Sequence, residues 1–371
     1  MKKPIRILQF GTGNFGRGGQ STIILNLGMK MNNEEFIFDY YVNEISDEKY
    51  IDIINEKGGK VFISKFSKIN FITRIKKFIE INKIIKGYKV IHINTDNSFF
   101  PFVVGIIGKI NKVEKIVIHS HSIKFNGKIL RVIGHRILKF FLPLIGNEFL
   151  ACSKKAAKWL YPRKILNKIK IINNGIDVEK YKFDLKKRKE LREKMNLKNK
   201  FVLGNIGRFS YVKNHKFLIE IFNEIQKKEK ESILLLIGNG ELEHEIRKQV
   251  EQLNLKDKVI FLGITDKVEE YLQIMDVFIF PSNFEGLGLV AIEAQAAALK
   301  VIASNNIPEE VKLTDYLEFL SLKKSQKIWC EKILQYKNNY ERKDTSKIIE
   351  KKGYSISNSV KNLKEVYMKN E

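Results

Sequence analysis

Cysteine is scarce in this sequence, with only Cys152 and Cys330 among 371 residues. Two thiols cannot form a disulfide framework or a four-cysteine zinc site, so we expect a reducing compartment. No run of about 18 uninterrupted apolar residues occurs, which predicts no membrane-spanning helix, and the basic start of the chain is too poor in apolar residues for a secretion signal. The balance of 44% hydrophobic and 29% charged residues excludes disordered, collagen-like and rod-like chains and indicates a globular protein of two domains.

Positive charge is abundant and unevenly distributed. The net charge is +25, and residues 1–175 hold 31 Lys and Arg against 12 Asp and Glu, whereas residues 176–371 hold 36 against 30. A basic first half suits an anionic partner, which can be nucleic acid, an anionic membrane face or a phosphorylated substrate. The chain is also rich in Lys, Ile and Asn throughout, so charge alone identifies no partner.

Apolar runs of strand length alternate with longer amphipathic stretches in both halves of the chain. The expected strands of the first half are Ile5–Phe10, Phe36–Val42, Lys60–Ile63, Val90–Ile93, Lys115–His119 and Glu148–Cys152. Those of the second half are Phe201–Gly207, Ser232–Ile237, Val259–Leu262, Val277–Pro281 and Lys300–Ala303. Continuous apolar strands separated by helical patterns favour parallel sheets covered on both faces, so we predict an α/β protein with two Rossmann-like domains.

Turn-forming residues mark the boundary between the two predicted domains. Asn173, Asn174 and Gly175 are followed by the highly charged stretch Lys186–Lys200. We therefore predict an N-terminal domain at 1–175 and a C-terminal domain at 176–354. The remaining tail, 355–371, has apolar residues at helical spacing and is expected to form one helix.

A glycine-rich segment, QFGTGNFGRGG at residues 9–19, follows the first expected strand. The glycines of Gly11–Gly16 match G-x-G-x-x-G, which leaves an NAD-dependent oxidoreductase open as an alternative. That fingerprint requires an acidic residue at the end of the second strand, whereas Asp39 lies in its middle. Gly18 and Gly19 continue the segment and allow the backbone to approach an anion at a helix start.

Two histidines, His119 and His121, lie at the end of an expected strand. In open α/β sheets ligands bind beyond the carboxyl ends of strands, where a histidine can bond a substrate hydroxyl or carry a proton. We favour a functional role for His121 and a structural one for His119.

Two cations follow the first strand of the second half. Arg208 ends that strand and Lys213 lies just before the next helical pattern. Arginine supplies bidentate hydrogen bonds, lysine a mobile point charge, and a helix N-terminus favours anions, so these residues predict a diphosphate site. In a chain this rich in lysine, two solvated surface cations are the plain alternative.

The block PSNFEGLGLVAIEAQAAALKVIAS, residues 281–304, contains Glu285 and Glu293 eight positions apart. Gly286 and Gly288 free the backbone between them to wrap a ligand. Acids near a helix start are favoured by the helix dipole, which accounts for Glu285 but not for Glu293 inside an apolar helix. Two carboxylates at a crevice can accept hydrogen bonds from sugar and ribose hydroxyls.

Taken in order, these motifs resemble the retaining glycosyltransferases of family 4, which have the two-domain GT-B fold with two Rossmann-like domains facing across a cleft. The resemblance runs over nearly the whole chain and is closest to the exopolysaccharide and capsular polysaccharide branch, in the segments HSHS, ACSKKAAKWL, GRFSYVKNH and EGLGLVAIEAQAA. Two residues depart from the family pattern: Ala298 and Lys300 stand where Gly and Pro are common, which puts the local turn in doubt.

The resemblance implies a role for each candidate residue. The expected catalytic residues are His121 on the transferred sugar, Arg208 and Lys213 on the diphosphate, and Glu285 on sugar hydroxyls. The expected donor-binding residues are Gly18 and Gly19 near the phosphates, Gly263 and Ile264 at the base, Gly286 and Gly288 around the ligand, and Glu293 on the ribose. The tail helix is expected to cross back onto the first domain.

The resemblance also implies the reaction, a hexosyltransferase-type transfer with retention from a nucleotide-sugar donor such as a UDP-sugar. The departing phosphate takes the proton of the acceptor on the same face, while cations stabilise the charge that develops on it. The sequence contains no Asp-x-Asp pair, so we expect neither a metal nor a cofactor.

The implied acceptor is a polyprenyl-diphosphate-linked saccharide at the inner face of the cell membrane, and the expected location is the cytoplasm with peripheral membrane contact. Lys65–Lys89 and Lys124–Phe149 mix cations with Phe and Ile, as an anionic membrane face would require, although amphipathic helices of the core have the same pattern. A non-catalytic nucleic-acid-binding protein is a third class, which charge alone favours; no recognition module is evident, and we expect no nucleic acid partner.

Overall fold

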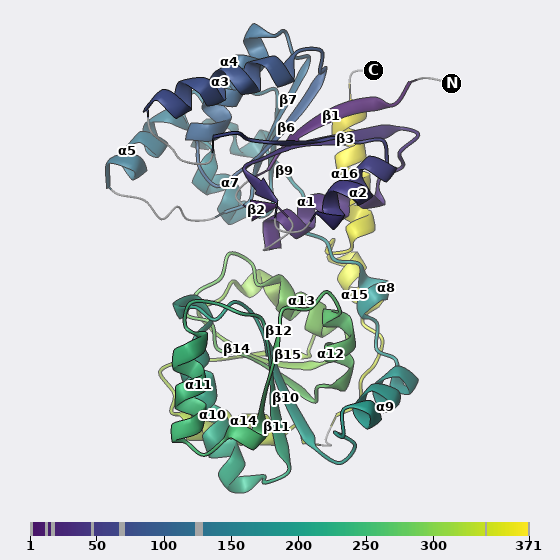
Figure 1. Ribbon diagram of the computed structural model, residues 1–371, viewed down its shortest axis with the longest axis vertical. Helices are drawn as coiled ribbons and strands as arrows, with labels where there is room; N and C mark the ends of the chain where they lie inside the picture. Colours follow the sequence, from purple (N-terminus) through teal and green to yellow (C-terminus); the bar gives the residue numbers. More distant parts are fainter. Residues whose placement is uncertain are drawn as a thin grey trace. The chain divides into compact units, whose positions relative to one another are not determined.

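The computed structural model describes residues 3–11, 14–15, 19–45, 48–66, 71–122, 129–337 and 340–369 (Figure 1). The chain divides into two compact units. Unit 1 consists of residues 1–175 and 356–371, and unit 2 of residues 176–355.

Unit 1 contains a parallel seven-stranded sheet in the order β5-β3-β1-β6-β7-β8-β9. Its strands are β1 Ile5–Phe10, β3 Phe36–Val42, β5 Val61–Ile63, β6 Val90–Thr95, β7 Lys115–Ser120, β8 Glu148–Ala151 and β9 Lys170–Ile171, and β2 Asn14–Phe15 pairs separately with β4 Glu44–Ile45. Its helices are α1 Gly19–Lys30, α2 Lys49–Glu56, α3 Phe71–Ile85, α4 Phe99–Ile110, α5 Ile129–Leu138, α6 Leu142–Ile145, α7 Lys154–Leu160 and α16 Ile356–Met368.

Unit 2 contains a parallel six-stranded sheet in the order β12-β11-β10-β13-β14-β15. Its strands are β10 Phe201–Ile206, β11 Ser232–Ile237, β12 Val259–Gly263, β13 Val277–Phe280, β14 Lys300–Ser304 and β15 Leu317–Leu320. Its helices are α8 Val178–Tyr181, α9 Leu185–Lys194, α10 His215–Lys228, α11 Glu243–Gln252, α12 Val268–Ile274, α13 Leu289–Ala296, α14 Gln326–Leu334 and α15 Ser346–Lys351.

Both sheets are parallel, and their strands are largely apolar on both faces because each face is covered by helices. In unit 2, Val202 of β10 packs into the core formed with α12 and α13, whereas its neighbour Leu203 packs into the core formed with α10, α11 and α14. Successive side chains of a strand point to opposite faces, so one apolar run serves two cores. The predicted fold class, α/β with two Rossmann-like sheets, is confirmed.

The strand order of each sheet reverses at one point. In unit 1 the chain moves outward from β1 to β3 and β5 and then returns to β6; in unit 2 it moves from β10 to β11 and β12 and returns to β13. Loops that leave neighbouring strands in opposite directions open a crevice at the carboxyl ends of those strands. The crevices are therefore expected beyond β1 and β6 in unit 1, and beyond β10 and β13 in unit 2.

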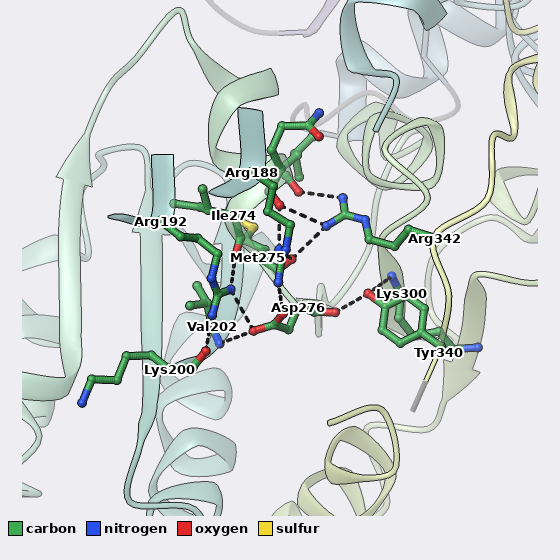
Figure 2. A network of polar contacts seen from close by, with 12 residues as sticks. Arg188, Arg192, Lys200, Val202, Ile274, Met275, Asp276, Lys300, Tyr340 and Arg342 are labelled. Atoms are coloured by element: carbon green, nitrogen blue, oxygen red, sulfur yellow. Dashed lines mark hydrogen bonds and ion pairs between the residues drawn. The ribbon is translucent and has the colours of Figure 1, made fainter. Parts of the chain in front are cut away.

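The opposite end of the unit 2 sheet is held by an arginine network (Figure 2). Arg188 and Arg192 of α9 both bind the carboxylate of Asp276, which also accepts a hydrogen bond of 2.7 Å from the backbone N–H of Val202. The guanidinium of Arg342 donates to backbone carbonyls at the end of α12. The network attaches α9 to the first residues of β10 and to Asp276, which directly precedes β13. It lies at the end of the sheet opposite the carboxyl ends of those strands.

The C-terminal helix α16 belongs to unit 1 although unit 2 precedes it in the sequence. It packs against α1 (Figure 1), and Leu363, Val366 and Tyr367 on one of its faces are buried. In the part of the chain that the structure describes, no helix combines the length and hydropathy needed to cross a bilayer.

The two residues that depart from the family pattern are accommodated differently. Ala298 follows α13 in a left-handed conformation with φ of 49°, and the N–H of Leu299 bonds the carbonyl of Ala294, so the helix ends in the usual way without glycine. Lys300 is buried at the start of β14, where its ammonium pairs with Glu318 at 2.5 Å and lies over the ring of Tyr336.

Candidate active site

In unit 2, two predicted site residues lie on either side of the point where the strand order reverses. Lys213 comes from the loop after β10, and Glu285 from the loop after β13. Their side chains form an ion pair, with Lys213 Nζ 2.7 Å from Glu285 Oε1, and both are largely buried, at 17% and 12% exposure. The ammonium also lies 4.8 Å from the centre of the Phe280 ring.

The backbone around this pair is held by bonds between the same two loops. The N–H of Asn283 donates to the carbonyl of Val212 at 2.8 Å, and the side-chain amide of Asn214 donates to the carbonyl of Pro281 at 3.1 Å. A Cβ at Gly207 would lie 2.9–3.1 Å from the methylenes of Lys213, so a larger residue there would displace the lysine side chain. The ion pair is therefore positioned by loops that are fixed to each other.

Glu293 lies in the middle of α13, where α8 packs against that helix. Burial raises the pKa of its carboxyl to about 7, although a hydrogen bond with Tyr181 and the charges of Lys180 and Lys213 lower it. Glu269, at the start of α12, raises that pKa further. Glu293 is thus a buried carboxylate within electrostatic range of Lys213. Tyr181, which orients it, was missed by sequence reasoning because an isolated tyrosine carries no local pattern.

Arg208 stands apart from this pair. Its side chain is 74% exposed and forms a surface ion pair of 3.0 Å with Glu241. The backbone of the next residue, Phe209, is fixed by bonds to Asn239 and Leu242. Arg208 therefore lies on the correct strand end but points its guanidinium at the loop after β11.

The predicted glycines occupy distinct settings along the carboxyl edge of the unit 2 sheet. Gly263 ends β12 with φ of +68°, and its carbonyl accepts a bond from Gly238, while the side chain of Ile264 is exposed. Gly288 precedes α13 with φ of +87°, against Phe280 and Glu285. Gly286 has open space where a Cβ would lie. Because β12 is two strands from β10 in the sheet, Gly263 and Ile264 lie about 10 Å from the carboxyl end of β10, the strand that leads to Lys213.

In unit 1, His121 follows β7 and its backbone N–H bonds the carbonyl of Thr95. Its Nε2 lies 2.9 Å from Oδ1 of Asn94, and its ring is 4.1 Å from that of His119. Burial lowers the pKa of His121 to about 3 and that of His119 well below its usual value. His121 is therefore a neutral imidazole at the carboxyl end of the sheet, and His119 is its buried neighbour.

Two predicted residues lie at the start of α1. Gly19 is the first residue of that helix, and Gly18 lies outside the described residues. Among the residues that the structure describes, no group of three or more His, Cys, Asp or Glu side chains gathers in a way that could hold a metal ion.

The chain is similar to known glycosyltransferases. Residues 187–354 match the family of glycosyl transferases group 1. The chain is 28% identical over 335 residues to EpsF of Bacillus subtilis, named as a glycosyltransferase, covering 88% of this chain and 86% of that protein. It is 27% identical over 289 residues to the Escherichia coli UDP-Gal:alpha-D-GlcNAc-diphosphoundecaprenol alpha-1,3-galactosyltransferase, covering 74% and 72%. Other relatives are named for capsular polysaccharide and O-antigen biosynthesis.

Among solved structures, the chain is similar to Anabaena HepE in complex with UDP and glucose, with a TM-score of 0.78, 16% identity, and coverage of 98% of this chain and 99% of that one. Two parallel Rossmann-like sheets with this overall similarity define the GT-B fold. Unit 2 contains a glycosyl transferases group 1 domain, and the chain is a glycosyltransferase.

Proposed function

We propose that this glycosyltransferase belongs to family 4 and transfers a hexose with retention from a UDP-sugar to a polyprenyl-diphosphate-linked saccharide, in the biosynthesis of a surface polysaccharide. The observation that carries the proposal is the buried Lys213–Glu285 pair at the strand-order reversal of unit 2, within range of Glu293. The Escherichia coli relative, whose name specifies a UDP-Gal donor and a diphosphoundecaprenol-linked acceptor, supports the choice of substrates.

The donor diphosphate takes the place of Glu285 as the partner of Lys213. Lys213 lies beside the N-terminus of α10, whose first N–H groups and dipole favour an anion. The exposed side chain of Arg208 reaches the same phosphates once it leaves Glu241.

Glu285, released from the lysine, accepts hydrogen bonds from sugar hydroxyls, and Glu293 accepts them from the ribose. Gly263 and Ile264 contact the base, and Gly286 and Gly288 line the ligand.

The chemistry follows from where charge develops. Cleavage of the anomeric C–O bond puts positive charge on the sugar ring and negative charge on the leaving phosphate. Lys213 and Arg208 stabilise that phosphate, and a preoriented group of this kind contributes roughly 2.7–4 kcal/mol to lowering a barrier. The leaving oxygen accepts the proton of the acceptor hydroxyl on the same face, so the anomeric configuration is retained without a metal. Neutral His121 accepts a hydrogen bond from a hydroxyl of the transferred sugar.

A basic and apolar surface on unit 1 suits the membrane that holds such an acceptor. Ile129, Ile133 and Ile137 are exposed at intervals of four along α5, and Leu130 and Leu144 are 82% and 73% exposed. This surface also carries cations, Arg131, Arg136 and Lys139, which favour anionic lipid. We propose that it contacts the inner face of the cytoplasmic membrane peripherally.

A transfer assay tests the reaction. The protein is incubated with a panel of nucleotide sugars and an undecaprenyl-diphosphate-linked sugar, the product is identified by mass, and its anomeric configuration by NMR. We expect a UDP-sugar to be used with retention and with no loss of activity in EDTA.

Lys213→Met should lower kcat about 100-fold or more, whereas Lys216→Met, which changes an exposed lysine on the first turn of α10, should leave kcat unchanged. Inversion, or equal activity of the two variants, would reject the mechanism.

Thermal stabilisation tests the donor separately. A ligand that binds only the folded protein raises the melting temperature, and the effect grows with the logarithm of the ratio of ligand concentration to Kd. We expect UDP to stabilise the protein, with a smaller effect in Glu293→Ala, and NAD to have none. Stabilisation by NAD and not by UDP would reject the proposed donor.

Liposome flotation tests the membrane surface. We expect binding to vesicles containing anionic lipid at low salt, release at high salt, and weaker binding of the double variant Leu130→Ser and Leu144→Ser. Leu185→Ser, which removes a leucine of comparable exposure from α9 of unit 2, is the matched control. If wild-type protein stays in solution at low salt, the membrane contact is wrong.

A further inference from the structure

The face of the unit 1 sheet that α1 and α16 cover carries buried polar side chains. Gln9 of β1, His92 and Asn94 of β6 and His119 of β7 are each 5% exposed or less, and His121 follows β7 directly. The register places Gln9 beside His92, and Asn94 beside His119. These residues gather where the strand order reverses, and a small cavity lined in part by Gln9, His92, His119 and Tyr367 lies against them.

One branch of hydrogen bonds joins Tyr367 of α16 to His121. Gln9 Nε2 donates to the Tyr367 hydroxyl at 3.1 Å, Asn94 Nδ2 donates to Gln9 Oε1 at 2.9 Å, and Asn94 Oδ1 faces His121 Nε2 at 2.9 Å. Asn94 Nδ2 also lies 3.2 Å from the carbonyl of Phe10, which can only accept. This carbonyl fixes the orientation of the Asn94 amide, so His121 Nε2 must carry the proton and its Nδ1 must be an acceptor.

A second branch joins the same hydroxyl to the ring beside His121. Among the described residues, the Tyr367 hydroxyl meets Gln9 Nε2, which can only donate, and His92 Nδ1 at 2.5 Å, so the hydroxyl proton is assigned to His92 Nδ1. His92 Nε2 then donates to His119 Nδ1 at 3.2 Å, and the ring of His119 lies 4.1 Å from that of His121. Each histidine is thereby assigned the Nε2–H form. Among the described residues, Nδ1 of His121 and Nε2 of His119 are buried without a hydrogen-bond partner.

We propose that Tyr367 is a positioning residue that fixes the tautomer and ring orientation of His121 through these two branches. The inference rests on the proposed function in one respect, the contact of His121 with the transferred sugar. Burial lowers the pKa of His92 and His121 to about 3 each, which keeps both rings neutral, as the assigned bonds require. The hydroxyl of Tyr367, which follows unit 2 in the sequence, thus keeps Nδ1 of His121 in unit 1 unprotonated and able to accept a hydrogen bond.

Tyr367→Phe tests the proposal because the phenyl ring keeps its contacts with Phe36 and Phe38 and only the hydroxyl is lost. His92 then loses its donor, and Gln9, 3.4 Å from His92 Nδ1, can turn to replace it and leave Asn94. His121 should lose its single tautomer. Long-range proton–nitrogen NMR on protein labelled at its six histidines reads each tautomer directly, and His121→Gln identifies the signals of His121.

Two further variants calibrate the result. Tyr161→Phe removes another buried tyrosine hydroxyl of unit 1, which donates to the backbone carbonyl of Ile118 or Leu150, and should leave the His121 signals unchanged. Asn94→Ala removes the direct partner of His121 and shows the signals of a released ring. We expect Tyr367→Phe to move the His121 signals toward those of Asn94→Ala, and Tyr161→Phe to match wild type.

Kinetics complete the test. We expect Tyr367→Phe to lower kcat about 3- to 10-fold, which corresponds to the contribution of one hydrogen bond. The Kd of UDP should stay within twofold of wild type, because the proposed nucleotide site lies in unit 2. Unchanged His121 signals would overturn the proposal, and so would moved signals with unchanged kcat. Absence of transfer by wild-type protein would instead reject the proposed function, and the NMR result would still decide the tautomer.

Discussion

At the scale of single residues, the candidate site includes groups that are unfavourable for folding. Burial raises the pKa of Glu293 from 4.5 to about 7, which means that the folded protein disfavours the ionised carboxylate. A carboxyl whose pKa is raised on folding stabilises the protein below its unfolded pKa, and this contribution is lost as the pH rises toward its folded pKa.

Glu293→Gln is therefore expected to stabilise unit 2 above pH 7. The free energy of unfolding should increase by up to about 3 kcal/mol at pH 8 relative to wild type, since each pKa unit corresponds to about 1.4 kcal/mol, and the difference should vanish below pH 4.5. Denaturant unfolding at both pH values measures it. Glu245→Gln, an exposed acid of α11, should show no such pH dependence. A variant less stable than wild type at pH 8 would contradict the assignment.

Gly286 offers a second test at this scale. A Cβ at this position meets nothing within 4 Å, so Gly286→Ala should leave the melting temperature within about 2 °C of wild type. If a donor sugar fills that space, the added methyl should raise the KM for the nucleotide sugar several-fold. Equal KM values would show that the ligand lies elsewhere.

Sequence reasoning named part of the candidate site and missed part of it. The spacing of Glu285 and Glu293 and the position of Lys213 after a strand were visible because each belongs to one local segment. Gln9, Asn94 and Tyr367 were not found, because they meet only when two strands and the C-terminal helix, far apart in the sequence, become neighbours. For Asn94 the signal was the alternation of polar residues in a strand otherwise rich in Ile, as in His92-Ile93-Asn94.

At the scale of elements, each strand expected from the sequence overlaps a strand of the two sheets. The ones not expected are short or at an edge: β9 has two residues, β15 is the last strand of its sheet, and β2 and β4 pair only with each other. Such segments are too short for an apolar run to stand out, and their pairing depends on the neighbouring strand. The predicted turn after α13 illustrates the same limit, because Ala298 adopts a conformation that its sequence disfavours.

The attachment of α9 provides a prediction at this scale. Asp276→Ala would leave Arg188 and Arg192 beside the sheet without their carboxylate, and removal of one partner from a largely buried ion pair costs about 3 kcal/mol or more. We expect a loss of this size in the stability of unit 2 by denaturant titration, with the Kd of UDP unchanged in the folded fraction. Asp257→Ala, an exposed acid before β12, is the control. A loss below 1 kcal/mol would show that the backbone bonds of the arginines suffice.

At the scale of the whole molecule, the two units differ in their response to acid. Burial lowers the pKa of four histidines in unit 1, namely His92, His119, His121 and His135. A base whose pKa is lowered on folding contributes stability above its unfolded pKa of about 6.5, and this is lost as the pH falls. In unit 2, burial lowers the pKa of His215 to about 4, but the raised pKa of Glu293 acts in the opposite direction.

Acidification from pH 7.5 to 5 should therefore destabilise unit 1 while leaving unit 2 nearly unchanged. Each deeply buried histidine loses about 2 kcal/mol of stabilisation at pH 5, and only part of this is offset by Asp96, whose pKa burial raises. The gain from Glu293 roughly balances the loss from His215 in unit 2. Hydrogen exchange followed by mass spectrometry, corrected for intrinsic rates, should show protection falling in β1, β6 and β7 but not in β10, β11 and β13. Protection retained in β1, β6 and β7 at pH 5 would mean that the histidine network accepts protons without opening, and would contradict the neutral tautomers assigned to it.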